Sequence, residues 1–328
     1  MRLEDRRSFL QKNVLKQPFR RGGYTLCLRI ASVRVDLLSG SPLLERRARE
    51  YFREYLADGP CHAEISLEEH SPLPGTPMVW DDPDPEFDVR GDVVIQRDFA
   101  ARRVDPRAGD PVVRAVAWVA PDLDDAVHNL LRWFLPRLLL PHDSLLVHAA
   151  AVVHEGRGYV FFGPSGAGKS TVASLLAGVE FRVVVVGDDS VIIQITKPGG
   201  RLEPWVHAAP LGCGYSRLAP APISVPLAGL YRLVQDDRHA IEAVSVTEGA
   251  AALLASTLCV DCAQDAAKRL TLACQFATSG AGIKKLHFTR DAGFWQHVLK
   301  YAGTEGRHEQ GGRWHVEQPN GSTAAGDG

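Results

Sequence analysis

A glycine-rich loop between two patterned segments constrains the fold of this chain more than any other feature. Residues 163–170 read Gly-Pro-Ser-Gly-Ala-Gly-Lys-Ser, which completes the Walker A pattern G-x-x-x-x-G-K-[ST]. An apolar, strand-like run (159–162) precedes the loop, and a helix-like run (171–177) follows it. Glycines allow successive N–H groups to turn toward an anion, and the N-terminus of the next helix attracts the same charge. The sequence therefore predicts a phosphate-binding loop in an α/β domain.

The side chains of this loop suit a nucleotide with its metal. Lys169 would bring a charge to the β- and γ-phosphates, and the Ser170 hydroxyl would ligate Mg²⁺. The alternative is a glycine-rich turn with a chance lysine, and the flanking strand and helix patterns argue against it. We expect ATP and Mg²⁺ as cofactors. The residues expected to bind the nucleotide are Gly163, Pro164, Ser165, Gly166, Ala167, Gly168, Lys169, Ser170 and Thr171.

An acidic pair follows the loop closely. The valine-rich run 181–187 predicts a fully buried strand at the centre of a sheet, and Asp188 and Asp189 end it. Carboxylates at the carboxyl end of a strand beside a phosphate loop are suited to ligate Mg²⁺ or to accept a proton. An exposed turn or a helix cap is the alternative. The valines and the nearby loop favour the functional interpretation.

A histidine lies in the apolar run that precedes the loop. His148 interrupts the strand-like segment 145–153, Leu-Leu-Val-His-Ala-Ala-Ala-Val-Val. Taken alone, a histidine in an apolar strand is more often a packed, hydrogen-bonded core residue than a functional one. The neighbouring loop and acidic pair make it a candidate for the site.

These segments together resemble the catalytic core of HPr kinase/phosphorylase and its relatives, whose nucleotide site is similar to that of ATP-dependent phosphoenolpyruvate carboxykinase. The runs LLVHAAAVV, GYVFFGPSGAGKST and FRVVVVGDDSVII occur in the order of that family. The match is close over about 144–196 and extends in outline to about 300. The resemblance implies that His148 lies near the transferred phosphate. It also implies that one of Asp188 and Asp189 deprotonates the acceptor hydroxyl while the other helps to hold the metal. As ligands of this metal we expect Ser170 and Asp188.

The chain departs from true HPr kinases in three places. Lys169 is followed by Ser-Thr where those enzymes have Ser-Glu, their RGLGI segment has no counterpart, and neither has the downstream loop associated with the reverse, phosphorolytic reaction. The chain therefore looks closer to divergent HPr kinase-like proteins, some of which phosphorylate a serine of a precursor peptide. The resemblance implies a phosphotransferase that acts on a serine of a peptide or small protein. A kinase for a small metabolite, with a serine or sugar hydroxyl as acceptor, and an ATP-gated binding module without transfer chemistry remain open.

A further candidate segment is 205–218, which the two glycines near its middle predict to be a mobile loop. Arg217 could meet a phosphate oxygen during transfer, although a surface salt bridge is the alternative. Trp205 and His207 could line an acceptor pocket, and an apolar strand end would explain the tryptophan equally well.

The composition is that of an ordinary globular protein, with 45% hydrophobic and 23% charged residues and a net charge of −2. This charge gives no reason to expect a nucleic acid or a membrane surface as partner, and no apolar run approaches the ~20 residues that span a bilayer.

Cys259 and Cys262 have C-x-x-C spacing in a helix-like stretch, without the second pair that would complete a zinc set. We expect a cytoplasmic protein with reduced thiols, for which a homo-oligomer is conceivable.

The predicted fold is α/β, with a P-loop kinase core of the HPr kinase/phosphoenolpyruvate carboxykinase type and an N-terminal α+β domain. We expect a basic N-terminal arm (1–23), an α+β domain for substrate or partner recognition (24–140), the P-loop domain (141–302) and a disordered tail (303–328). In the N-terminal domain we expect a strand pair in 24–37, a helix over 41–59, a loop over 71–86, an antiparallel meander over 93–120 and a helix over 122–140 with a kink or break at Pro136. In the P-loop domain we expect strands at 145–153, 158–162, 182–187, 190–196, 227–234 and 285–288, and helices after the loop, from 247, over 264–278 and over 291–301.

Overall fold

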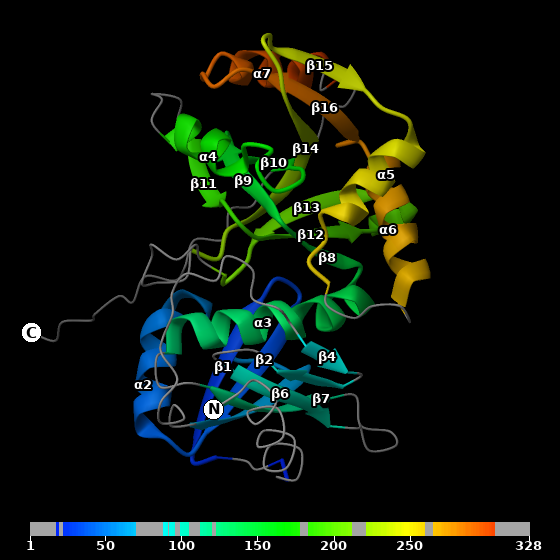
Figure 1. Cartoon of the computed structure of the whole chain (residues 1–328). Coiled ribbons are helices and arrows are strands. Elements are labelled where there is room, and N and C mark those ends of the chain that lie inside the picture. Colours follow the sequence, from blue (N-terminus) through cyan, green and yellow to red (C-terminus); the bar gives the residue numbers. More distant parts are fainter. Residues whose placement is uncertain are drawn as a thin grey trace, which may run out of the picture.

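The chain forms a mixed α/β structure built on two sheets, as shown by a computed structural model (Figure 1). The structure describes residues 18–19, 22–69, 88–90, 92–95, 99–104, 112–119, 123–177, 183–211, 221–259 and 265–305. The expected arm (1–23), the expected loop (71–86) and the expected tail (303–328) therefore lie almost wholly outside the described residues.

The first sheet has the strand order β1-β2-β3-β7-β6-β5-β4. β1 and β2 form the expected antiparallel pair, and β5, β6 and β7 form the expected meander. β3, which the sequence patterns did not predict, is parallel to both β2 and β7 and joins these two units into one sheet. The bounds are β1 (Tyr24–Ile30), β2 (Val33–Ser39), β3 (Ala63–Glu69), β4 (Asp88–Arg90), β5 (Val93–Ile95), β6 (Phe99–Val104) and β7 (Val113–Val119).

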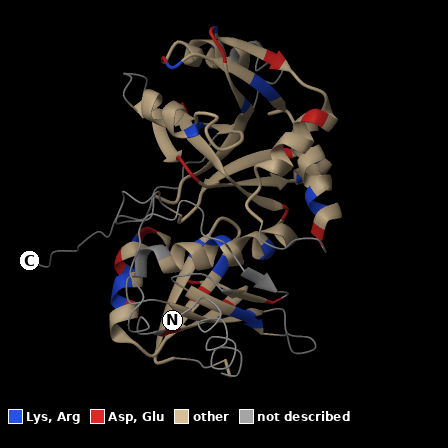
Figure 2. Ribbon diagram, in the orientation of Figure 1, with Lys and Arg blue, Asp and Glu red and all other residues tan. Residues whose placement is uncertain are grey.

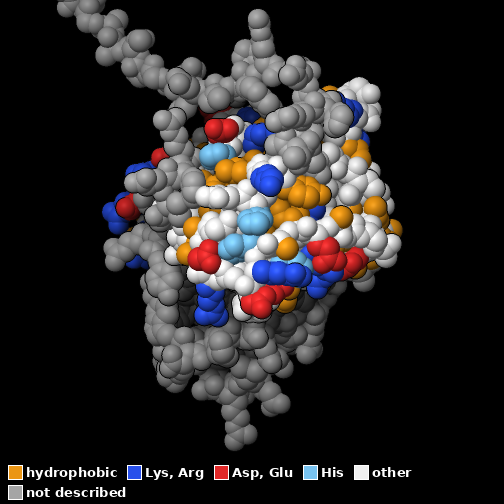
Figure 3. All heavy atoms as spheres, turned by 90° about the horizontal axis from the view of Figure 1, so that it is seen from above, with side chains coloured by type: hydrophobic (Ala, Val, Ile, Leu, Met, Phe, Trp, Pro, Cys, Tyr) orange, Lys and Arg blue, Asp and Glu red, His pale blue; other side chains and the backbone are white. Residues whose placement is uncertain are grey.

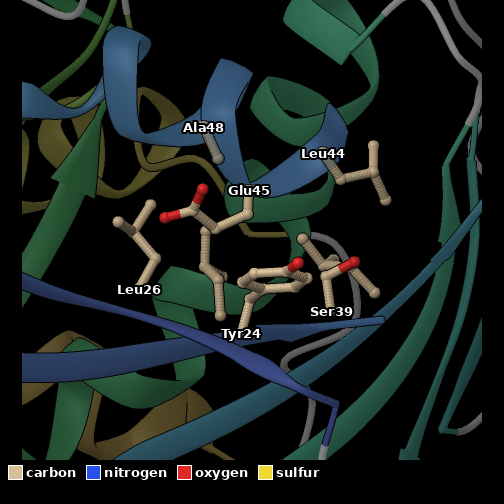
Figure 4. A pocket seen from close by; sticks show the side chains of 8 residues that line it. Tyr24, Leu26, Ser39, Leu44, Glu45 and Ala48 are labelled. Carbon is tan, nitrogen blue, oxygen red and sulfur yellow. The ribbon is translucent and has the colours of Figure 1, made fainter. Parts of the chain in front are cut away.

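Helix α2 (Pro42–Tyr51) packs against β1 and β2. The Ser41 hydroxyl caps it by accepting a hydrogen bond from the Leu44 N–H, and a proline occupies the first turn. The helix ends at Tyr51, well before the expected end at 59, and a 3₁₀ turn η1 (Arg53–Tyr55) follows. A shallow apolar pocket opens between α2 and the sheet, with Glu45 among its lining residues (Figure 4). This pocket belongs to the packing of the first sheet and not to the glycine-rich loop.

Helix α3 (Leu123–Leu139) lies between the two sheets (Figure 1). It contacts β6 and β7 on one side and β8 on the other. Its buried leucines belong to the same core cluster as Leu146 and Ile192 of the second sheet. The helix continues through Pro136, so that the break offered there as one alternative does not occur.

The second sheet has the strand order β11-β9-β10-β14-β13-β12-β8, with β16 beside β14 and β15 beside β16. β10, β14 and β16 are mutually parallel, whereas β9 is antiparallel to both β10 and β11. The strands are β8 (Ser144–Val147), β9 (Ala149–His154), β10 (Arg157–Phe162), β11 (Val183–Gly187), β12 (Val191–Thr196), β13 (Glu203–Ala208), β14 (Ser224–Gln235), β15 (Ala240–Ala243) and β16 (Ile283–Phe288). The helices and 3₁₀ turns of this part are η2 (Leu140–His142), α4 (Lys169–Ala177), η3 (Pro198–Gly200), α5 (Val246–Ala255), α6 (Ala266–Thr278) and α7 (Phe294–Glu305).

Two strand predictions in this sheet were wrong. The valine-rich run was expected at the centre of the sheet, but β11 lies at its edge beside β9, and Val184 is 51% exposed. A run of β-branched residues favours a strand without indicating whether one or two strands flank it. The predicted strand 145–153 is interrupted at His148, so that β8 pairs with β12 while β9 pairs with β10 and β11.

The expectation of reduced thiols was wrong for Cys259, which is disulfide-bonded. The sequence pattern placed this residue in a helix, where cysteine behaves as a small apolar residue. In the structure α5 ends at Ala255, and the cysteine lies in the irregular segment that follows. Among the described residues, no helix is both long and apolar enough to span a membrane.

The position of α3 between the sheets leads to a test of stability. Leu130 is 0% exposed in this helix, so that Leu130→Ala should lower the free energy of unfolding by about 2–5 kcal/mol through lost burial and a cavity. Leu270→Ala is the matched control, because Leu270 is 51% exposed on α6 and its change should stay within about 0.5 kcal/mol. Urea unfolding followed by circular dichroism measures both. Equal effects of the two substitutions would contradict the packing described here.

Candidate nucleotide and phosphoryl-transfer site

Strand pairing brings three candidate segments together at one end of the strands of the second sheet, and this end is called the sheet edge below. β10 and β11 both run antiparallel to β9, so that their carboxyl ends flank the start of β9. Phe162, which precedes the glycine-rich loop, pairs with Ala149, the first residue of β9. The loop, His148 and the acidic pair after Gly187 consequently share this edge, although the sequence separates them.

The glycine-rich loop (163–168) adopts a conformation that requires glycine. Gly166 and Gly168 have φ values of 77° and 103°, in the region that side chains disfavour. A Cβ on Gly168 would also lie 2.6 Å from the ζ carbon of Phe288, at the end of β16. The side-chain amide of Gln235, at the end of β14, donates a 2.7 Å hydrogen bond to the Gly166 carbonyl. The ends of two neighbouring strands therefore hold the loop in place.

Lys169 is the first residue of α4 and is only 6% exposed. Its ammonium group donates hydrogen bonds of 3.0 Å to the carbonyl oxygens of Gly163 and Pro164. Burial lowers its pKa below the ordinary value. Both acceptors are neutral, so an anion placed in the loop would stabilise the buried charge far better than they do. This environment fits the phosphate-binding role expected of Lys169.

Ser170 and Thr171 occupy the first turn of α4, where the Val172 N–H donates a 2.9 Å hydrogen bond to the Gly168 carbonyl. The Ser170 side chain is exposed. In the part of the chain that the structure describes, no group of three or more His, Cys, Asp or Glu residues is arranged to hold a metal ion. The Mg²⁺ of a nucleotide site takes one or two protein ligands together with phosphate and water oxygens. Ser170 and one carboxylate are enough for such a site.

The two aspartates have different surroundings. The Asp189 carboxylate forms an ion pair with Arg132 and accepts a 3.0 Å hydrogen bond from the Ser190 hydroxyl. Its backbone carbonyl also accepts a 3.2 Å hydrogen bond from the Ala149 N–H. Asp188 is half-buried and makes no hydrogen bond or ion pair with the other described residues. Figure 2 shows this acidic turn on the side of the second sheet that faces the first. Asp188 is therefore the carboxylate that is free to take a ligand.

His148 is held in one orientation by the residues around it. Its backbone N–H donates a 2.8 Å hydrogen bond to the Ser256 carbonyl. Its ring Nδ1 lies 2.7 Å from the Asp189 carbonyl, which can only accept, so that Nδ1 carries the proton and Nε2 remains an acceptor. Burial, with the charges of Lys169 and Arg132, lowers the pKa of His148 to about 4. The imidazole is consequently neutral near pH 7.

Arg132 is a residue of this edge that the sequence patterns missed. It comes from α3, outside the second sheet, and its guanidinium reaches the Asp189 carboxylate. Burial lowers the pKa of Arg132 below its ordinary value. The signal in the sequence was an arginine in the otherwise apolar run Leu130-Leu-Arg-Trp-Phe-Leu135. A charge in such a run predicts a specific partner, because a buried charge without one is costly.

The expectations for 205–218 were partly wrong. Trp205 and His207 lie in β13, between β12 and β14, and are not part of a loop. His207 is buried, hydrogen-bonds through Nδ1 with the Ser224 hydroxyl at 2.8 Å, and has its pKa lowered to about 4 by burial. It is a packed strand residue rather than part of an acceptor pocket. Arg217 lies outside the described residues.

A second polar cluster lies on the other side of the loop, at the ends of β14 and β16. His287 contacts Asp236 at 2.7 Å, and His239 contacts Asp291 at 3.0 Å. The rings of His239 and His297 lie 5.7 Å apart. Figure 3 shows histidine side chains gathered at the centre of the face that carries β15, β16 and α7. The sequence patterns missed this cluster, because its members come from separate segments.

Comparison with known families matches part of this chain. The sequence model of a family described as "ScmC: SynChlorMet cassette protein ScmC" matches residues 135–273. This segment runs from the end of α3 to α6 and includes the glycine-rich loop, His148 and the acidic pair. Arg132 lies just before it. A search of curated proteins found no match to this chain.

The surroundings of His148 lead to a pH prediction. We expect its ring to titrate near pH 4 instead of its ordinary 6.5, because burial and two nearby cations disfavour the imidazolium. Since the pKa is lower in the folded state, the stability that His148 contributes is present above pH ~6.5 and is lost as the pH falls through about 4. Ring-proton NMR over this range, assigned with His148→Gln, measures the midpoint.

A pair of variants provides the control for this titration. Lys169→Met should raise the midpoint of His148, because it removes one of the two cations. Lys197→Met should not move it, since Lys197 pairs with Asp143 on the surface. A midpoint near 6.5 in the unmodified protein would contradict the described environment.

Proposed function

We propose that this chain is an ATP- and Mg²⁺-dependent kinase of the HPr kinase-like type, which transfers a phosphoryl group to a hydroxyl. One observation carries the proposal. The glycine-rich loop with its buried Lys169, the neutral imidazole of His148 and the unpaired carboxylate of Asp188 share one sheet edge. Nucleotide binding alone needs the loop and a single metal ligand, and the additional groups are those that phosphoryl transfer uses.

Each residue at this edge has a separate role in the proposed reaction. Lys169 and the loop amides bind the β- and γ-phosphates and stabilise the charge that develops on them. Ser170 and Asp188 hold Mg²⁺, which neutralises phosphate charge when it is bound. Asp189 accepts the proton of the attacking hydroxyl. The neutral His148, with Nε2 free to accept a hydrogen bond, orients the acceptor hydroxyl.

We further propose a serine of a peptide or small protein as the acceptor. A peptide needs more contact area than the candidate site offers. The first sheet ends in β1 and β4; Leu56 already bridges to Leu28 of β1, so that β4 is the edge strand to which an extended peptide could add. Because the matching family is described as a cassette protein, the neighbouring genes are the first place to look for the acceptor. A small metabolite with a hydroxyl is the second candidate, since it presents the same reactive group.

The nucleotide site is tested by removing its lysine. Lys169→Ala should weaken ATP·Mg²⁺ binding by about 2–3 kcal/mol, because a buried charge that faces the phosphates is lost. Titration calorimetry measures the affinity, with Lys197→Ala as the control on an exposed lysine that pairs with Asp143. Equal affinities of Lys169→Ala and the unmodified protein would exclude the phosphate-binding role.

Substitutions of the two aspartates distinguish an enzyme from an ATP-binding module without transfer chemistry. Asp189→Asn should not weaken ATP binding, yet should slow transfer or ATP hydrolysis by roughly 10²–10⁴-fold, because it removes the proton acceptor. Asp188→Asn should instead weaken the Mg²⁺-dependent part of nucleotide binding. Asp143→Asn, at a surface ion pair with Lys197 and Lys268, is the control. If the unmodified protein turns over no hydroxyl acceptor while ATP alters partner binding, the chain is an ATP-gated module.

A further inference from the structure

Arg132 connects the first half of the chain to the candidate site. Helix α3 is fixed by its neighbours, since Leu130, Leu131 and Trp133 are all buried in the core. Arg132 leaves this helix on the side of the second sheet and pairs with Asp189. The packing of α3 therefore determines where the guanidinium lies.

The partner of Arg132 lies beside the phosphate loop. Asp189 is held against His148, whose ring Nδ1 is 2.7 Å from the Asp189 carbonyl and 3.3 Å from its carboxylate, and His148 directly precedes the strand that pairs with the end of β10. β9 alone separates β11 from β10. Two strand spacings of about 4.8 Å put the acidic turn roughly 10 Å from the loop, a gap that a triphosphate tail and an arginine side chain can bridge together.

The preceding turn of α3 contributes no competing charge. His128, one turn before Arg132, contacts the Tyr51 hydroxyl of α2. Burial, and then the charge of Arg132, lowers the pKa of His128 to about 4. His128 is thus neutral near pH 7 and does not attract an anion. Of these two side chains, only Arg132 carries a charge that can meet a phosphate.

We propose that Arg132 binds the γ-phosphoryl group of the nucleotide, and that its ion pair with Asp189 is the resting state of this contact. The inference rests on the proposed kinase function. The Arg132 and Asp189 side chains are 32% and 25% exposed, and a partly solvated ion pair is weak enough to exchange for a phosphate with more negative charge. A guanidinium suits both partners because its donors match carboxylate and phosphate oxygens equally well.

The exchange would couple nucleotide binding to catalysis. When Arg132 turns to the γ-phosphoryl oxygens, the Asp189 carboxylate loses its cation and becomes available to the acceptor. The acceptor oxygen then forms a bond to phosphorus, the bond from phosphorus to the bridging oxygen of ADP breaks, and the hydroxyl proton passes to Asp189. The first half of the chain thus supplies a residue of the active centre.

The test compares two ligands that differ by one phosphate. On the full chain, the affinities of Mg²⁺·ADP and of a Mg²⁺-bound imido analogue of ATP are measured by calorimetry. Arg132→Gln should weaken binding of the ATP analogue by about tenfold or more while ADP affinity stays within about twofold, because only the ATP analogue has a γ-phosphoryl group. Arg132→Lys should recover part of the loss. Arg137→Gln is the control, since Arg137 lies on the same helix and contacts Asp92.

The outcomes separate this inference from the function on which it rests. Retained ADP affinity shows that each variant is folded. If Arg132→Gln changes both affinities alike, or neither, then Arg132 only supports Asp189 or the fold, and the inference is wrong while the kinase proposal stands. If the unmodified protein binds neither nucleotide, the proposed function itself fails.

Discussion

The pairing of β9 between β10 and β11 is the constraint on which the candidate site depends. Because both neighbours run antiparallel to β9, the ends of two strands and the start of the third fall at one edge. Backbone hydrogen bonds give each of these segments a defined position, and a one-residue change of register would reverse the facing of every side chain on the slipped strand. His148 occupies the point where the chain passes from β8 into β9, and its N–H is held by the Ser256 carbonyl.

Helix α3 extends this constraint to the first sheet. It buries leucines against both sheets and presents Arg132 to the acidic turn, so that the edge of the second sheet includes a side chain from outside it. The two aspartates differ for this reason. Arg132 and Ser190 engage Asp189, whereas Asp188 makes no such contact within the described residues. The asymmetry motivates the roles proposed for the pair.

Local patterns predicted much of the fold. The hairpin of β1 and β2, the meander of β5 to β7, the strand before the loop and the helices α4 to α7 follow from periodicity and turn residues, which act over a few neighbouring positions. The patterns missed β3, β4, β13 and β15 and placed β11 at the centre of the sheet. The error about β11 concerns which strand lies beside which, a property of long-range pairing that residue type does not encode. The same limit explains Cys259, whose helix ends earlier than its composition indicated.

The sequence by itself determined the glycine-rich loop, its lysine and the nearness of an acidic pair, because a phosphate-binding loop is a local conformation that a few residues specify. Only the tertiary structure distinguished the two aspartates, brought Arg132 to one of them, and fixed the orientation of the His148 ring. Those relations depend on the register of β9 and on the packing of α3 between two sheets. Both arise from contacts among segments far apart in the chain, and such contacts form only when the whole core is assembled.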